Sequence, residues 1–388
     1  MSIRPVKRVI TSQPTIEGAG VHLRRAFGFH NTSDFDPFLL LDDFRNDIPA
    51  DYLAGFPWHP HRGIETITYV LAGTVEHGDS MGNKGAIAAG DIQWMTAGSG
   101  IIHQEMPKGD QAGRMHGFQL WANLPSAQKM TPPRYQEIKS LDIPEIKDDD
   151  STEVRVICGD FWGKVGPVEG IATNPTYIDV SIAPGRRKTL PVETMRHAFA
   201  YVFGGSGKFC DASSPLAVPT EGVKWLDTNP PSAVNDRSLV LFDGGDEITV
   251  QAGDEGIRFL LVSGRPLQEP VAWYGPIVMN TQEQLRQAFE ELGVGKLLHA
   301  HQIDDQVRPE IGRKTRHQIA YEIIVQLVNC AELRLRDAVG PAKVERGRPP
   351  GARTVGLAPL RGLKDRIDFL LTELPAGHGF FLLALFPY

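Results

Sequence analysis

The chain has 388 residues and a formal net charge of −7 at pH 7, a length sufficient for two or three domains. The acidic balance argues against direct nucleic-acid binding, because a phosphate backbone requires clustered Lys and Arg. Only three cysteines occur, and the sequence contains neither a signal-peptide pattern nor an apolar run of about eighteen residues. We therefore expect a cytoplasmic protein without disulfide bridges or membrane spans.

Residues 56–71 contain the first pair of candidate metal-ligating residues along the chain. Phe-Pro-Trp-His-Pro-His at 56–61 precedes Ile-Glu-Thr-Ile-Thr-Tyr-Val-Leu at 64–71, which alternates like a strand. Side chains two residues apart on a strand share a face, so His59 and His61 are expected to point the same way. An isolated His-x-His pair is more often two packed or surface histidines, so this pair needs support from elsewhere in the chain.

A second same-face pair, His103 and Glu105, follows another strand-like run at 89–95. Together the two pairs supply three imidazoles and one carboxylate. This donor set suits iron, copper, nickel, cobalt or manganese better than calcium or magnesium, which prefer oxygen ligands. The sequence therefore predicts a metalloprotein.

An internal repeat predicts two related β domains. Residues 65–73 correspond to residues 197–205, and a stretch rich in Pro and charge at 130–150 is typical of a connector. We predict domains at 1–140 and 141–292, each a barrel or a sandwich of short strands. The second copy lacks the His-x-His and His-x-Glu pairs, so we expect one metal site per chain, in the first domain.

Residues 281–292 form the clearest predicted helix, with Thr281 as N-cap, Gln284 at the capping-box position and one apolar stripe. The remaining residues, 293–388, form a C-terminal extension with three alternative interpretations. It is a small docked α/β appendage, a partner-binding extension, or a segment that does not fold, and the last two are preferred.

Several segments together resemble the pirin family of two-domain cupin proteins. They are residues 35–44, 56–66, 90–98, 100–107, 119–125 and 274–280. The resemblance covers residues 1 to about 292 and implies two stacked cupin domains, each an antiparallel β-barrel of the jelly-roll type, with a short C-terminal helix. It also implies iron, as Fe(II) or Fe(III), held in the N-terminal barrel by His59, His61, His103 and Glu105.

The identity of the carboxylate ligand is a separate question. In cupins generally the ligand lies a few residues after the His-x-His pair, which here would be Glu65. In pirins it lies two residues after the third histidine, which is Glu105. We favour Glu105 because the surrounding pirin motif is intact, and we expect Glu65 to be a partner outside the ligand shell or a salt-bridged strand residue.

The family resemblance implies two alternative functions. The first is a quercetin 2,3-dioxygenase that opens a flavonol ring with O₂, with Glu105 also acting as general base. The second is a redox-sensing, metal-dependent co-regulator that binds a protein partner without significant turnover.

Weaker signals concern the surroundings of the site. Trp58, Trp94, Met95 and Met106 are candidates for lining an aromatic substrate cavity, although such residues are mostly core. Arg62 is expected to pair with an acid near the site.

Overall fold

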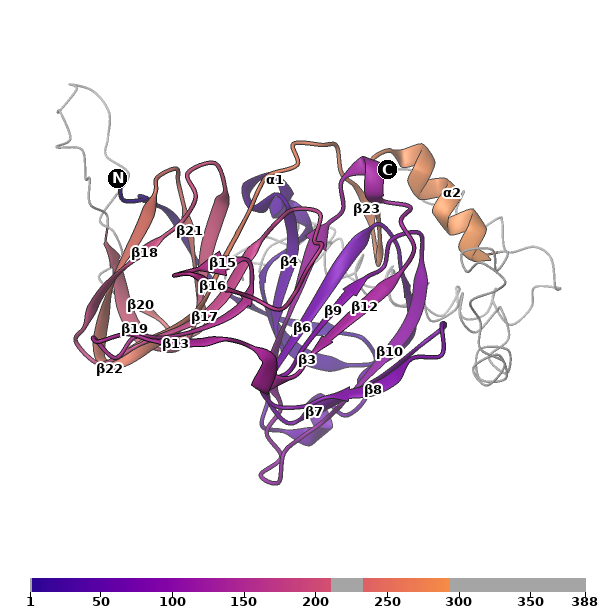
Figure 1. The fold of residues 1–388 in the computed structure, drawn as a ribbon. Helices are drawn as coiled ribbons and strands as arrows, with labels where there is room; N and C mark the ends of the chain where they lie inside the picture. The colour runs from indigo at the N-terminus through magenta and orange to yellow at the C-terminus, as the bar shows by residue number, and fades with distance from the viewer. Residues whose placement is uncertain (1, 211–232, 294–388) are drawn as a thin grey trace, which may run out of the picture. The chain divides into compact units, whose positions relative to one another are not determined.

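The computed structural model describes residues 2–210 and 233–293, so the predicted C-terminal extension at 293–388 lies outside the described residues except at position 293. Within these ranges the regular structure consists mostly of strands with few helices, which confirms the predicted all-β fold (Figure 1). No helix in the described part of the chain is long and apolar enough to cross a membrane.

Two sheets make up the first domain. The seven-stranded sheet has the order β12 (Arg134–Ile138), β9 (Ile92–Thr96), β6 (Ile64–Ala72), β11 (His116–Asn123), β4 (Phe38–Asp43), β3 (Val21–Phe27) and β2 (Gln13–Glu17). The four-stranded sheet has the order β5 (Phe56–His61), β10 (Ile101–Lys108), β7 (Thr74–Asp79) and β8 (Lys84–Ile87). All pairings are antiparallel, and β5 lies at an edge.

The second domain is a nine-stranded sheet. Its main order is β1 (Val6–Thr11), β21 (Ser238–Phe242), β19 (His197–Cys210), β22 (Glu247–Gly264), β17 (Thr176–Ile182), β14 (Glu153–Cys158) and β13 (Glu145–Lys147), with β18 (Arg187–Pro191) on β22 and β20 (Val234–Asn235) on β19. The N-terminal strand β1 thus pairs with this sheet. The domain boundaries at residues 140 and 292 stay a prediction.

Shorter elements complete the described chain. They are β15 (Asp160–Phe161) paired with β16 (Lys164–Val165), β23 (Ala272–Tyr274) paired with β24 (Ile277–Met279), the helices α1 (Thr32–Phe35) and α2 (Gln282–Gly293), and 3-10 turns at Phe29–Asn31, Pro49–Asp51, Ser126–Gln128 and Ser140–Asp142.

The seven-stranded and nine-stranded sheets share one apolar core. Two hydrogen bonds across this core reflect the internal repeat. The Tyr69 hydroxyl of the first domain donates to Asp179 of the second at 2.8 Å. The Tyr201 hydroxyl, at the matching repeat position, donates to Asp43 of the first domain at 2.9 Å. Both tyrosines are buried in the shared core, so each repeat donates a tyrosine hydroxyl hydrogen bond to an aspartate of the other domain.

The predicted capping box of α2 is confirmed. The backbone N–H of Gln284 donates to the Thr281 hydroxyl oxygen, and the Gln284 amide oxygen accepts from the backbone N–H of Thr281, each at 3.2 Å. Leu285 and Ala288 pack against the β23–β24 hairpin, as the predicted apolar stripe requires.

Lys129 is a buried lysine that joins three segments. Its Nζ donates to the carbonyl oxygens of Gly63 at 2.8 Å and Val278 at 3.0 Å and to the side-chain oxygen of Asn123 at 2.5 Å. Burial lowers the pKa of Lys129 to about 7, although the negative charge of Glu269 opposes the shift. The ordinary lysine pKa is about 10.4, so between pH 7 and pH 10 the unfolded chain binds the additional proton.

We therefore expect the free energy of unfolding to rise with pH over this range, by about 2 kcal/mol between pH 7 and pH 9 from this group. Lys129→Met should remove this contribution. It should also lower stability by about 1–3 kcal/mol at pH 9, because carbonyl oxygens lose their donor. Urea unfolding of both proteins at the two pH values measures the difference, and equal pH slopes would contradict the assignment.

Candidate metal centre

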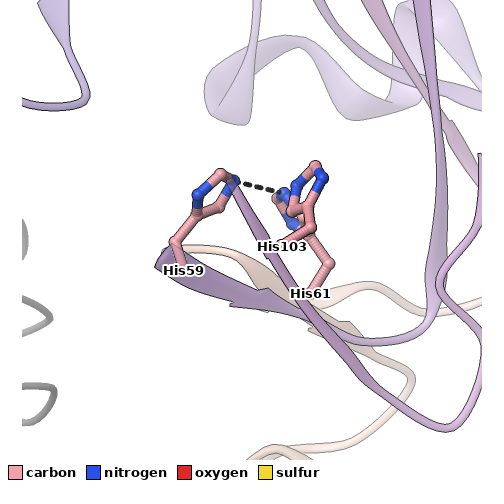
Figure 2. A group of neighbouring side chains, drawn as sticks. All are labelled: His59, His61 and His103. Atoms are coloured by element: carbon pink, nitrogen blue, oxygen red, sulfur yellow. Dashed lines mark hydrogen bonds between the residues drawn. The ribbon is translucent and has the colours of Figure 1, made fainter. Parts of the chain in front are cut away.

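The pairing of β5 with β10 brings three histidines together. His103 lies directly opposite His59, and His61 shares the face of His59 two residues along the strand. One ring nitrogen from each residue lies within 4.8 Å of the others, and Figure 2 shows the rings turned toward one another. The edge position of β5 explains how Pro57 and Pro60 are tolerated, since an edge strand can do without their N–H groups.

Carbonyl oxygens define the tautomers of two of these rings. His59 Nδ1 lies 2.9 Å from the Pro57 oxygen, and His61 Nδ1 lies 3.3 Å from the Pro276 oxygen. A carbonyl only accepts, so each Nδ1 carries the proton and each neutral ring has its lone pair on Nε2. These two Nε2 atoms are 3.1 Å apart (dashed in Figure 2). A hydrogen bond between them would require one ring to be an imidazolium.

The surroundings disfavour that imidazolium. Burial lowers the pKa of all three histidines, and it lowers the values for His61 and His103 well below the usual range. Both ring nitrogens of His103 are buried, and neither has a hydrogen-bond partner among residues 2–210 and 233–293. Neutral imidazoles with converging, unpartnered nitrogens are the donor set that a transition-metal ion requires. The residues present therefore fit a bound metal ion.

Glu105 lies beside this group and is not one of its members. The β5–β10 register shifts between His103 and Glu105. The buried Glu105 carboxylate accepts from the Thr68 hydroxyl at 3.0 Å and from the Gln119 amide at 3.1 Å. Its negative charge opposes the lowering of the His59 pKa, which shows that the carboxylate acts on the histidine group. Its role as fourth ligand stays a prediction.

Glu65 faces a different part of the structure. It lies on the same face of β6 as Ile67 and Tyr69, which pack in the core shared by the two domains. Its carboxylate accepts from the Thr96 hydroxyl at 2.7 Å, and burial raises its pKa. Thr68, on the opposite face of the same strand, is the residue that reaches Glu105.

A small apolar cavity of about 20 Å³, with room for roughly one water molecule, is lined in part by Glu105 and by none of the three histidines. Its polar lining consists of Thr68, Glu105 and Gln119, and its apolar lining includes Val21, Phe44, Tyr52, Phe56, Val75 and Met115. The four residues suggested by sequence, Trp58, Trp94, Met95 and Met106, are not among those that line it. Trp94 instead packs in the core between the domains.

Sequence reasoning also missed Thr68 and Gln119, because a Thr or Gln on a strand carries no motif. The expectation for Arg62 is confirmed, since its Nη1 forms an ion pair with Glu291 at 2.8 Å. The acid comes from helix α2, more than two hundred residues along the chain.

Comparisons with known proteins agree with this geometry. The family model for pirin matches residues 20–122, and the model for the pirin C-terminal cupin domain matches residues 177–297. A pirin-like protein of Caulobacter vibrioides is 44% identical over 297 residues, which are 76% of this chain and 100% of that protein. A pirin-like protein of Arabidopsis thaliana is 40% identical over 293 residues, 74% of this chain and 88% of that protein.

Solved structures extend the likeness to the fold. The crystal structure of a quercetin 2,3-dioxygenase from Acinetobacter baumannii superimposes with a TM-score of 0.66 at 30% identity, covering 76% of this chain and 99% of that one. The predicted arrangement of two cupin domains is thereby confirmed. This chain belongs to the pirin family.

Proposed function

We propose that this protein is an iron-dependent flavonol 2,3-dioxygenase of the quercetinase type, with one iron ion held by His59, His61, His103 and Glu105. The observation that carries the proposal is the set of converging, unprotonated histidine nitrogens beside a buried carboxylate that accepts two hydrogen bonds. The likeness to the Acinetobacter dioxygenase supports the same reaction class.

The reaction consumes one flavonol and one O₂ and yields a ring-opened ester and carbon monoxide. Both atoms of O₂ enter the ester, and the carbon monoxide takes one ring carbon of the flavonol with the oxygen attached to it. Iron supplies Lewis acidity toward the enol oxygen and electron exchange with O₂. Glu105 takes the enol proton as general base and returns it to the product.

The protein groups around Glu105 suit this proton transfer. Thr68 and Gln119 hold the carboxylate by hydrogen bonds, so its orientation does not depend on the substrate.

Metal binding tests the first requirement. Protein purified without oxygen is expected to contain about one iron per chain, and His103→Ala should lose it. Added metal should stabilise the metal-free wild type by about 2.7 kcal/mol at a free concentration one hundred times Kd, and should not stabilise the variant. Elemental analysis and thermal unfolding measure both effects. The control is His22→Ala, which changes a half-exposed histidine outside the group and should behave as wild type.

A matched pair of substitutions tests the carboxylate. Glu105→Gln should lower metal content and reduce turnover about 10²–10⁴-fold, since it removes a negative ligand and a base. Glu65→Gln replaces another buried glutamate and should leave both unchanged, because its carboxylate contacts Thr96 on the other face of β6. Metal loss in Glu65→Gln with retention in Glu105→Gln would reassign the ligand. An unchanged pH–rate profile in metal-loaded Glu105→Gln would remove the base role.

Turnover itself separates the two functions of the family. We expect quercetin consumption with equimolar O₂ uptake and carbon monoxide release, and loss of all three in His61→Ala. The measurements are quercetin absorbance, an oxygen electrode and carbon monoxide trapping. Stoichiometric iron without turnover would instead favour the redox-sensing co-regulator, to be tested by partner binding in the Fe(II) and Fe(III) states.

A further inference from the structure

The chain passes back to the metal site after it has finished the second domain. Residues 265–293, called here the return segment, follow β22 and contain the β23–β24 hairpin and α2. Figure 1 shows β23 and α2, in orange, beside the purple strands of the first domain. This placement matters because the return segment contacts two consecutive residues of the site, His61 and Arg62.

The contact with His61 is a hydrogen bond from the ring. Its Nδ1 lies 3.3 Å from the carbonyl oxygen of Pro276, at the turn of the hairpin. This contact assigns the proton to Nδ1 and leaves the Nε2 lone pair for the converging group. The face of the ring is also flanked, since Trp121 lies edge-on to His61 at 5.0 Å between centroids and Trp273 of the return segment lies 6.0 Å from Trp121.

The backbone next to His61 is fixed by the same segment. The backbone N–H of Val278 donates to the Arg62 carbonyl at 3.1 Å, and Arg62 forms a parallel bridge with Ile277. A Cβ at Gly63 would come within 1.9 Å of the Val278 oxygen, and the φ of Gly63 is +78°. Only glycine permits this approach, so the close packing of β24 on the end of β5 is built into the sequence.

The side chain of Arg62 extends the connection to α2. It is buried, its Nε donates to the Ser99 carbonyl at 2.6 Å, and its Nη1 pairs with Glu291 at 2.8 Å. Ser99 precedes β10, the strand that carries His103. One guanidinium therefore links both ligand-bearing strands to the last turn of the helix.

We propose that Pro276 and Glu291 are positioning residues for the metal centre, and that metal affinity depends on the docking of α2. This inference rests on the metal binding proposed above. Partners that orient a ligating histidine through its other nitrogen change metal affinity by about 10–100-fold when they are lost. Glu291 acts indirectly. It holds the side chain of Arg62, the residue that follows His61 and whose carbonyl accepts from Val278 of β24.

The helix offers a matched pair of variants for the test. Glu291→Gln removes the charge that pairs with buried Arg62. Glu290→Gln removes the neighbouring charge, which pairs with Arg286 on the exposed side of α2. We expect Glu291→Gln to raise the Kd for Co²⁺ about 10-fold or more and to alter the visible absorption of the bound cobalt, whereas Glu290→Gln should match wild type. Competition with a chromophoric chelator gives the Kd, and circular dichroism establishes that each variant is folded.

A second measurement does not depend on the variants. Binding free energies are reciprocal, so if α2 docking strengthens metal binding, Co²⁺ must also stabilise the docked helix. Amide hydrogen exchange in α2 should slow when Co²⁺ is added to wild type and should not change in His61→Ala.

The outcomes separate the two proposals. Wild type that takes up one Co²⁺, with equal affinities for Glu291→Gln and Glu290→Gln and no change of exchange in α2, would overturn the inference and leave the proposed function intact. Wild type that takes up no metal would overturn both.

Discussion

The site depends on one constraint, which is that the Nε2 lone pairs of His59 and His61 face each other. His59 and His61 each use Nδ1 on a carbonyl oxygen, so their Nε2 atoms, 3.1 Å apart, are both acceptors. Burial disfavours the proton that would bridge them, and a bound metal cation would resolve the conflict. The scaffold must therefore hold an arrangement that is unfavourable by itself. Two contacts hold this arrangement in place. On one side β5 pairs antiparallel with β10, and on the other side the return segment packs against the end of β5.

The two domains show how one repeat serves two purposes. Tyr69 and Tyr201 occupy matching positions and make matching contacts with Asp179 and Asp43, so the repeat is preserved where the domains meet. It is not preserved in the interiors. The second domain is filled by a cluster of Val, Ile, Leu, Phe and Ala side chains, whereas the first has small apolar clusters around the polar site. The shared core stabilises both domains. Because of this, the first domain can bury histidines in its interior in place of aliphatic residues.

What could be predicted from sequence was local. The convergence of His59 with His61 follows from strand geometry alone, and the capping box of α2 needs only four consecutive residues. Strand alternation does not extend from His61 to Glu65, because Gly63, with φ +78°, separates β5 from β6 and the two strands lie in different sheets. The contact of Pro276 with His61 could not be predicted, and neither could the identity of Glu291 as the acid that pairs with Arg62. Each contact joins residues more than two hundred positions apart, and no side-chain pattern marks a backbone carbonyl as a histidine partner.

In the proposed function Glu105 would serve both as metal ligand and as general base, and its hydrogen bonds are compatible with both roles. A carboxylate offers about four acceptor positions on its two oxygens. Thr68 uses Oε1, and Gln119 reaches Oε2 at 3.1 Å and Oε1 at 3.3 Å. Both donors come from the seven-stranded sheet, while Glu105 itself lies on the four-stranded sheet beside the histidines. The carboxylate is therefore held from across the barrel, and a lone pair remains for a metal ion or a substrate hydroxyl. Because the donors are neutral, they orient the group without cancelling its charge, which is the condition under which one residue can serve both as ligand and as base.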